Sequence, residues 1–262
     1  MLNLNLNKKD IIMRLITLIL ISCIFANAQI NTEKYRPQQD STGFSWQSEV
    51  GFKLQKGNVD FQELSIENLA AWLYPSNKIL FIISGDLGWE DGKRFSNEML
   101  AHLRNVYNLS KAWQAEFFVQ TDYNKSRLLD QRFVIGSGLR FRAMGIKKEG
   151  LWLGSAVMFE QEDYDLPAQA KHPQSTKTWR LSSYMSFITN LKEYIAFNGV
   201  VYFQPAFKNF DDFKLVAESG LIVKVSAHFS LTTVFKYRFD QKPPDNIKKN
   251  DFLTESGLRF SF

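Results

Sequence analysis

Residues 113–123, WQAEFFVQTDY, alternate apolar and polar side chains with a period of two. Trp113, Ala115, Phe117, Val119, Thr121 and Tyr123 share one face, and Phe118 alone breaks the polar face. Successive side chains of a β-strand point to opposite sides, so the pattern predicts a strand with one apolar and one polar face. The segment is long enough to cross the apolar layer of a membrane as a tilted strand.

The same alternation recurs along the rest of the chain, clearly at residues 79–89 and 229–239. About twelve such blocks follow residue 44, an even number as in single-chain bacterial barrels. The expected strands lie near residues 44–56, 61–74, 78–90, 97–109, 112–125, 132–143, 150–162, 176–189, 193–204, 212–224, 228–240 and 251–262.

These blocks predict an all-β fold, a transmembrane antiparallel up-and-down β-barrel of about 12 strands over residues 44–262. Mean hydropathy is −0.24, and no apolar run after residue 28 reaches the ~20 residues of a transmembrane helix. A soluble sandwich is the alternative, but it would not need aromatic residues at its strand ends. Aromatic girdles at the two membrane interfaces are expected from Trp72, Tyr74, Trp89, Trp113, Tyr123, Trp152, Tyr164, Trp179, Tyr194 and Tyr237.

The connections between the predicted strands differ in length. Those at 74–77, 109–112, 191–192 and 225–227 are short, whereas those at 89–97, 124–131, 164–176, 205–212 and 241–250 are longer and polar. Short turns face the periplasm and long loops face outward in such barrels. Both termini are therefore expected in the periplasm, although the tight hairpin at 56–60 departs from the rule.

The N-terminus resembles a secretory signal over residues 1–28. Basic residues Lys8, Lys9 and Arg14 precede the apolar segment 15–25, and Ala26-Asn27-Ala28 forms a small-residue cleavage site. Cleavage would leave Gln29 first, with 29–43 as a short periplasmic segment. Met13 is an alternative start, and the only cysteine, Cys23, leaves a lipoprotein signal as a second alternative.

The last predicted strand ends the chain on an aromatic residue. Phe252, Leu258, Phe260 and Phe262 alternate with polar residues. A terminal aromatic on such a strand resembles the signal by which the barrel-assembly machinery recognises its clients. Phe262 is therefore the predicted insertion signal, and the expected partners are this machinery and outer-membrane lipid.

The strand parity places charges of both signs inside the barrel. The predicted lumen charges are Glu67, Asp86, Glu98, Arg104, Glu116, Arg140, Arg142, Glu160, Arg180, Glu218, Lys236, Arg238, Glu255 and Arg259, with Glu63, His102, Asp122, Lys214 and Lys224 on the same parity. Isolated charges in a narrow interior are costly, so paired charges are expected. The sequence predicts a narrow, salt-bridged and hydrated lumen rather than a wide pore.

Candidate catalytic and metal-binding residues are few. His228 and Ser230 have the spacing of a lipase dyad, as in outer membrane phospholipase A, but Phe229 takes the outward parity and no third partner is evident. His102 and His172 belong to no ligand cluster. The acidic run Glu160, Glu162, Asp163 and Asp165 is a calcium candidate, and Lys242, Lys248 and Lys249 are candidates for contact with anionic sugar phosphates. A solvated extracellular loop is the favoured interpretation of both sets.

Several turn and strand-end motifs together resemble a known bacterial family. These are Gly57-Asn58-Val59-Asp60, residues 237–240 (YRFD), Lys242-Pro243-Pro244 and the C-terminal segment 257–262 (GLRFSF). They are similar to the domain of unknown function 481 (DUF481) family, some members of which are labelled salt-induced outer membrane proteins. The resemblance implies an outer-membrane barrel and supplies no catalytic residues.

The expected function is therefore a non-enzymatic outer-membrane barrel with a structural, envelope or interaction role. The alternatives are a channel or transporter for ions or small solutes and, more remotely, a lipid-modifying enzyme. No cofactor or metal is expected. The net charge of +5 is mixed along the chain, so nucleic acid is not an expected partner.

Overall fold

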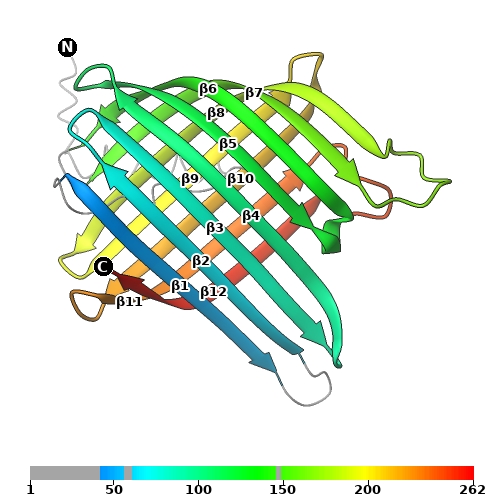
Figure 1. Cartoon of the computed structure of the whole chain (residues 1–262), viewed down its shortest axis with the longest axis horizontal. Helices are drawn as coiled ribbons and strands as arrows, with labels where there is room; N and C mark the ends of the chain where they lie inside the picture. Colours follow the sequence, from blue (N-terminus) through cyan, green and yellow to red (C-terminus); the bar gives the residue numbers. More distant parts are fainter. Residues whose placement is uncertain (1–41, 56–60, 146–148) are drawn as a thin grey trace, which may run out of the picture.

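The computed structural model describes residues 42–55, 61–145 and 149–262, in which twelve antiparallel strands form a closed barrel (Figure 1). This confirms the predicted all-β barrel. Within these residues no helix has the length and apolar character of a membrane-spanning helix. The strands are β1 (Gly43–Gln55), β2 (Phe61–Leu73), β3 (Asn77–Glu90), β4 (Lys93–Asn108), β5 (Trp113–Asn124), β6 (Leu129–Met144), β7 (Gly150–Tyr164), β8 (Ser175–Lys192), β9 (Ile195–Ala206), β10 (Asn209–Lys224), β11 (Phe229–Asp240) and β12 (Asn250–Ser261).

The barrel closes where the first strand meets the last. Each strand pairs with the next in sequence, and β1 pairs with β12 from Gln47↔Ser261 to Gly51↔Gly257. The Phe262 amide donates to the Trp46 carbonyl at 2.9 Å, and the Trp46 amide donates to the Phe262 carbonyl at 3.0 Å. The last residue of the chain therefore forms part of the seam that removes the sheet edges.

The two faces of the barrel wall have opposite chemistry. Phe117 and Phe235 are 45% and 42% exposed on the outside, whereas Gln120 and Thr232 on the same strands are 4% and 3% exposed on the inside. The alternation that predicted the strands thus separates an apolar outer surface from a mainly polar interior.

Aromatic residues gather near both ends of the outer surface. Exposed rings at the end where β1 begins and β12 finishes include Trp72, Tyr74, Trp113 and Tyr194, and Trp179 is exposed at the opposite end. The predicted girdle positions Trp152 and Tyr164 were wrong, because they are 1% and 8% exposed and face inward. Both share the parity of Glu160 on β7, and the Trp152 ring packs under the guanidinium groups of Arg140 and Arg142 at 5.3 and 5.8 Å.

The barrel has a terminal end, where β1 begins and β12 finishes, and an opposite loop end (Figure 1). Two long connections, residues 165–174 and 241–249, lie at the loop end. The expected tight hairpin at 56–60 lies outside the described residues.

Three of the predicted long loops are compact turns. Asp91 and Gly92 join β3 to β4 with positive φ values of 48° and 75°, the geometry of a tight hairpin turn in which glycine is favoured, so residues 93–97 belong to β4. Asn124 caps the short 3-10 helix η2 (Lys125–Arg127) by accepting from the Arg127 amide at 3.1 Å. β9 extends to Ala206 and β10 starts at Asn209, with an irregular register near Phe213.

A charge placed on the lipid face of this barrel should destabilise it. We expect Phe117→Arg or Phe235→Arg to lower the free energy of unfolding by about 2–4 kcal/mol near the bilayer midplane. Urea denaturation in lipid vesicles, followed by heat-modifiable gel migration, measures the change. The matched control is Gln131→Arg, an exposed outward position near the loop end, and equal losses at both sets of sites would contradict the placement of Phe117 and Phe235 near the midplane.

Candidate functional site

The interior side chains of the barrel form the candidate site. Strand alternation directs the predicted lumen charges inward to different depths. Arg104, Glu116, Arg140, Glu160, Arg180, Glu218 and Arg259 are buried, and Glu67, Asp86, Glu98, Arg142, Lys236, Arg238 and Glu255 are partly buried.

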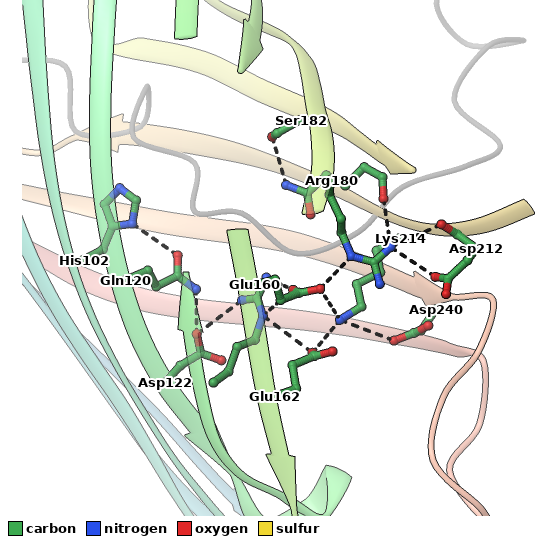
Figure 2. Close-up of polar contacts among 12 residues, drawn as sticks. His102, Gln120, Asp122, Glu160, Glu162, Arg180, Ser182, Asp212, Lys214 and Asp240 are labelled. Carbon is green, nitrogen blue, oxygen red and sulfur yellow. Dashed lines mark hydrogen bonds and ion pairs between the residues drawn. The ribbon is translucent and has the colours of Figure 1, made fainter. Parts of the chain in front are cut away.

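The centre of the interior polar network is Glu160 on β7 (Figure 2). One of its oxygens accepts from Arg132 at 2.7 Å, and the other accepts from Arg180 at 2.6 Å and from Lys214 at 3.1 Å. These four side chains are 1–5% exposed. A buried carboxylate with three cationic donors is fully hydrogen-bonded, which offsets the cost of removing its charge from water.

Four further carboxylates balance the surrounding cations. Asp122 accepts from Arg132 at 3.3 Å, and Asp212 accepts from Arg180 at 3.1 Å. Glu162 pairs with Lys214, and Asp240 lies 3.9 Å from the same ammonium group. Figure 2 shows these groups converging from β5, β7, β8, β10 and β11.

Four members of this network were not among the predicted lumen charges, namely Arg132, Glu162, Asp212 and Asp240. Arg132, Asp212 and Asp240 lay at the margins of predicted strands, where boundaries are least certain. Glu162 was considered only as part of an acidic run. Glu162 lies two residues after Glu160 and shares its inward parity, which could have identified it as a lumen residue.

A second ionic cluster surrounds Glu116 on β5. Arg104 contacts this carboxylate at 2.8 Å and Arg140 at 3.3 Å. The Tyr184 hydroxyl donates to Glu116 at 2.6 Å and accepts from Arg104 at 3.3 Å. The cluster joins β4, β5, β6 and β8 and is 1–7% exposed.

A third contact ties the barrel seam from the inside. Arg259 on β12 donates to Glu49 on β1 at 2.6 and 3.0 Å, and the Thr232 hydroxyl donates to the same carboxylate at 2.5 Å. Glu49 was absent from the predicted lumen set, although its odd parity on β1 opposes the outward Trp46 and Val50.

His102 joins the first network through an amide. Its Nδ1 atom lies 3.2 Å from the Gln120 oxygen, and Gln120 donates to Asp122 at 2.7 Å. Asp122 also accepts from Arg132, so a continuous polar chain runs from His102 to Asp240 (Figure 2). His102 is 0% exposed and stacks on Phe118, which describes a buried, packed histidine.

A cavity of 130 Å³ occupies the half of the interior nearest the loop end. Its wall contains nine carboxylates and five cationic side chains. The carboxylates are Glu49, Glu67, Asp86, Glu98, Asp122, Glu162, Glu218, Asp240 and Glu255, and the cations are Arg127, Arg132, Lys214, Lys236 and Arg238. The formal charge of the lining is therefore negative.

Two of these acids face each other directly. Asp86 and Glu98 are register partners on β3 and β4, and their carboxyl groups are hydrogen-bonded to each other. Such a bond requires one of the two groups to carry a proton. Glu98 also accepts from Asn124, and Lys236 and Arg238 supply nearby positive charge. The pair therefore carries one negative charge beside these cations, and the negative excess of the cavity wall comes from its other carboxylates.

The interior nearer the terminal end is apolar on one side. Leu69, Ala71 and Leu73 of β2 form a buried cluster with Leu80 and Ile82 of β3, all 0–8% exposed. The predicted charges therefore line only part of the interior. The clustered residues carry the inward parity of their strands, and packing them together removes apolar surface from water.

The turn η2 with Leu128 and the loops 165–174 and 241–249 together form what we name the loop-end cap. The amides of Lys171 and His172 donate to Asp245 Oδ2 at 2.5 and 3.0 Å. These hydrogen bonds, that from His172 first, hold the pKa of Asp245 below its ordinary value. The Asp165 amide donates to the Leu128 carbonyl at 2.9 Å, and Leu166 packs with Leu129 and Tyr164.

The residues of the candidate catalytic dyad and of the candidate calcium site do not come together in the structure. His228 Nδ1 lies 2.8 Å from the Ser261 carbonyl, and its ring stacks on Phe262, with no contact between His228 and Ser230 among the described hydrogen bonds. Strand alternation directs Glu160 and Glu162 inward and Asp163 outward, so the acidic run does not converge on one ion. Within the described ranges, no three His, Cys, Asp or Glu side chains gather as metal ligands.

The three candidate basic residues for contact with sugar phosphates do not share one contact. Lys242 lies 3.7 Å from Asp212, and Lys248 and Lys249 are exposed in the loop 241–249. His172 is also in the cap, where its ring meets the edge of Tyr164 at 5.0 Å.

Comparison with known proteins gives a family and a distant likeness in fold. The NanC porin aligns at 9% identity and a TM-score of 0.45 over 84% of this chain and 98% of its own, and the translocator domain of the autotransporter NalP from Neisseria meningitidis at 11% and 0.44 over 97% and 96%. The KdgM porin in complex with disordered oligogalacturonate aligns at 11% and 0.43 over 83% and 99%. No curated protein matches. The profile described as "Protein of unknown function, DUF481" matches residues 48–262, which confirms the resemblance and shows that the chain belongs to this family.

Proposed function

We propose that this protein is an outer-membrane barrel that admits small cations and small cationic solutes into its loop-end cavity and conducts them slowly. The observation that carries this proposal is the charge of the cavity wall, with nine carboxylates against five cations. Rings of acidic side chains favour cations in membrane pores. The sign of the lining charge therefore determines which solutes the cavity would admit.

The width of the interior argues for slow passage. The cavity has a volume of 130 Å³, below the roughly 300–1,000 Å³ of pockets that hold a drug-sized ligand. Below it, the Glu116 cluster and the apolar cluster around Leu69 and Ile82 fill much of the cross-section. A large hydrated solute does not fit such a space.

The proposed setting follows the expectations from the sequence. Residues 1–28 would direct export and be removed before Gln29, and Phe262 would guide insertion by the assembly machinery. The loop end would face the outside, and both termini would face the periplasm. The proposal gives the protein no catalytic step and no cofactor.

A structural role in the envelope is the second candidate, and the Glu160 network favours it. Arg132, Arg180 and Lys214 approach this one carboxylate from three strands, β6, β8 and β10. Such a network holds distant strands at fixed separations, which suits a stiff barrel in a membrane. The two candidates differ in whether the refolded protein carries current.

Conductance in planar bilayers tests the first candidate. In a KCl gradient, we expect discrete openings with a reversal potential that indicates preference for K⁺ over Cl⁻. A screened charge in contact with an ion is worth about 1 kcal/mol, so Asp86→Asn combined with Glu98→Gln should lower the K⁺/Cl⁻ permeability ratio by roughly fivefold.

Asp130→Asn provides the matched control for that experiment, because Asp130 is an exposed loop-end acid that pairs with Lys125 outside the cavity. It should leave the ratio unchanged. Anion preference, or a folded protein without openings, would contradict the cation conduit and leave the structural candidate.

Removal of the Glu160 carboxylate tests the stiffness of the network. Glu160→Ala leaves three buried cations without their shared partner, so we expect a loss of about 3–5 kcal/mol in the free energy of unfolding. The midpoint of urea unfolding measures this, with Asp130→Asn as the exposed comparison expected to show no resolvable change. A loss as small as that of the comparison would mean that the network does not stabilise the barrel.

A further inference from the structure

We infer that the loop-end cap is a gate over the cavity and that Asp245 is its latch. The inference rests on the proposed function, because the gate controls access to the same cavity. The contacts that carry it join loops that lie far apart in the sequence.

The latch joins two connections that are not neighbours in the barrel wall. Loop 165–174 follows β7 and loop 241–249 follows β11, so strands β8, β9, β10 and β11 lie between them along the wall. The Asp245 carboxylate nevertheless accepts hydrogen bonds from the amides of Lys171 and His172. The two loops therefore reach each other across the end of the barrel rather than along its rim.

The cap also forms the roof of the cavity. Arg127 of η2, Tyr164 at the end of β7 and Pro244 of loop 241–249 all line it. Pro244 is buried although its neighbours Pro243 and Asp245 are partly exposed, so this loop turns inward. Arg127 lies 3.7 Å from Asp251, a second contact between the η2 side of the barrel and the start of β12.

The contacts of the cap differ in kind from those below it. Glu160 and its three cationic partners are 1–5% exposed. By contrast, the bond from Lys171 to Asp245 is exposed, that from His172 is partly buried, and the Arg127 and Asp251 side chains are 22% and 49% exposed. Water competes for exposed hydrogen bonds and screens exposed charges, so they open more readily than buried ones. The roof can thus open while the wall remains intact.

The acceptor atoms of Asp245 determine how the latch responds to substitution. Alanine removes the acceptor for both amides, whereas asparagine keeps one oxygen that accepts from an amide but loses the charge. Release of Asp245 frees the inward turn at Pro244 and opens the route from the loop end to the cavity. If the contact did not hold the cap closed, neither Asp245→Ala nor Asp245→Asn would change access to the cavity.

Thiol labelling measures access to the cavity without relying on conduction. Ser84 lines the cavity, and Cys23 is the chain's only cysteine, so Ser84→Cys gives a reporter whose background is measured with Ser84 intact. The probe is a membrane-impermeant cationic methanethiosulfonate applied to the refolded protein in lipid vesicles. Adding Asp245→Ala should increase the labelling rate roughly tenfold, and Asp245→Asn should increase it less.

Asp211→Ala is the matched control, an exposed loop-end acid outside the cap, and should leave the labelling rate unchanged. Equal labelling rates of the reporter with and without Asp245→Ala would overturn the gate. If Asp245→Ala speeds labelling but no variant conducts, the gate stands and the cation conduit fails. If the barrel conducts but labelling is insensitive to the substitutions of Asp245, the conduit stands and the gate fails.

Discussion

Closure of the sheet is the constraint on which the rest of this structure depends. A lipid bilayer offers no water to unpaired backbone amides and carbonyls, so a sheet that spans it must pair its first strand with its last. Here that pairing involves Phe262, whose amide and carbonyl both bond to Trp46. Closure in turn gives every strand a lipid side and an interior side, which is why alternation extends through nearly the whole sequence.

The size of the closed barrel then determines what its interior can hold. Twelve strands leave a modest space, and in this chain ion pairs occupy much of it. Glu160 balances three cations and Glu116 balances two. Each cluster joins strands far apart in the sequence, so the same side chains that narrow the lumen also hold its wall in shape. A narrow interior and a stiff wall have one physical cause.

The fold followed from the sequence because strand alternation is a local property that each block shows independently. The turns were predicted less well. The polar residues 89–97 predicted a long loop, whereas the structure has a tight hairpin turn at Asp91 and Gly92. Trp152 has the same inward parity on its strand as Glu160, but its aromatic side chain led to its assignment to the girdle. The partners in the charge pairs and the cap contacts could not be predicted from one sequence. Glu160 and Lys214, like Asp245 and His172, lie far apart along the chain, and no local sequence pattern indicates that they meet.

The distribution of contact types along the barrel axis determines where the molecule can move. Around Glu116 and Glu160, opening a contact would leave buried charges without partners, which is strongly unfavourable. At the cap, Asp245, Arg127 and Asp251 exchange their partners for water at much smaller cost. The weakest contacts therefore lie directly above the cavity, whose wall carries nine carboxylates against five cations. Motion and charge selection are thus expected at the same end of the barrel, because a cation that reaches the cavity must first pass the contacts that water can most easily replace.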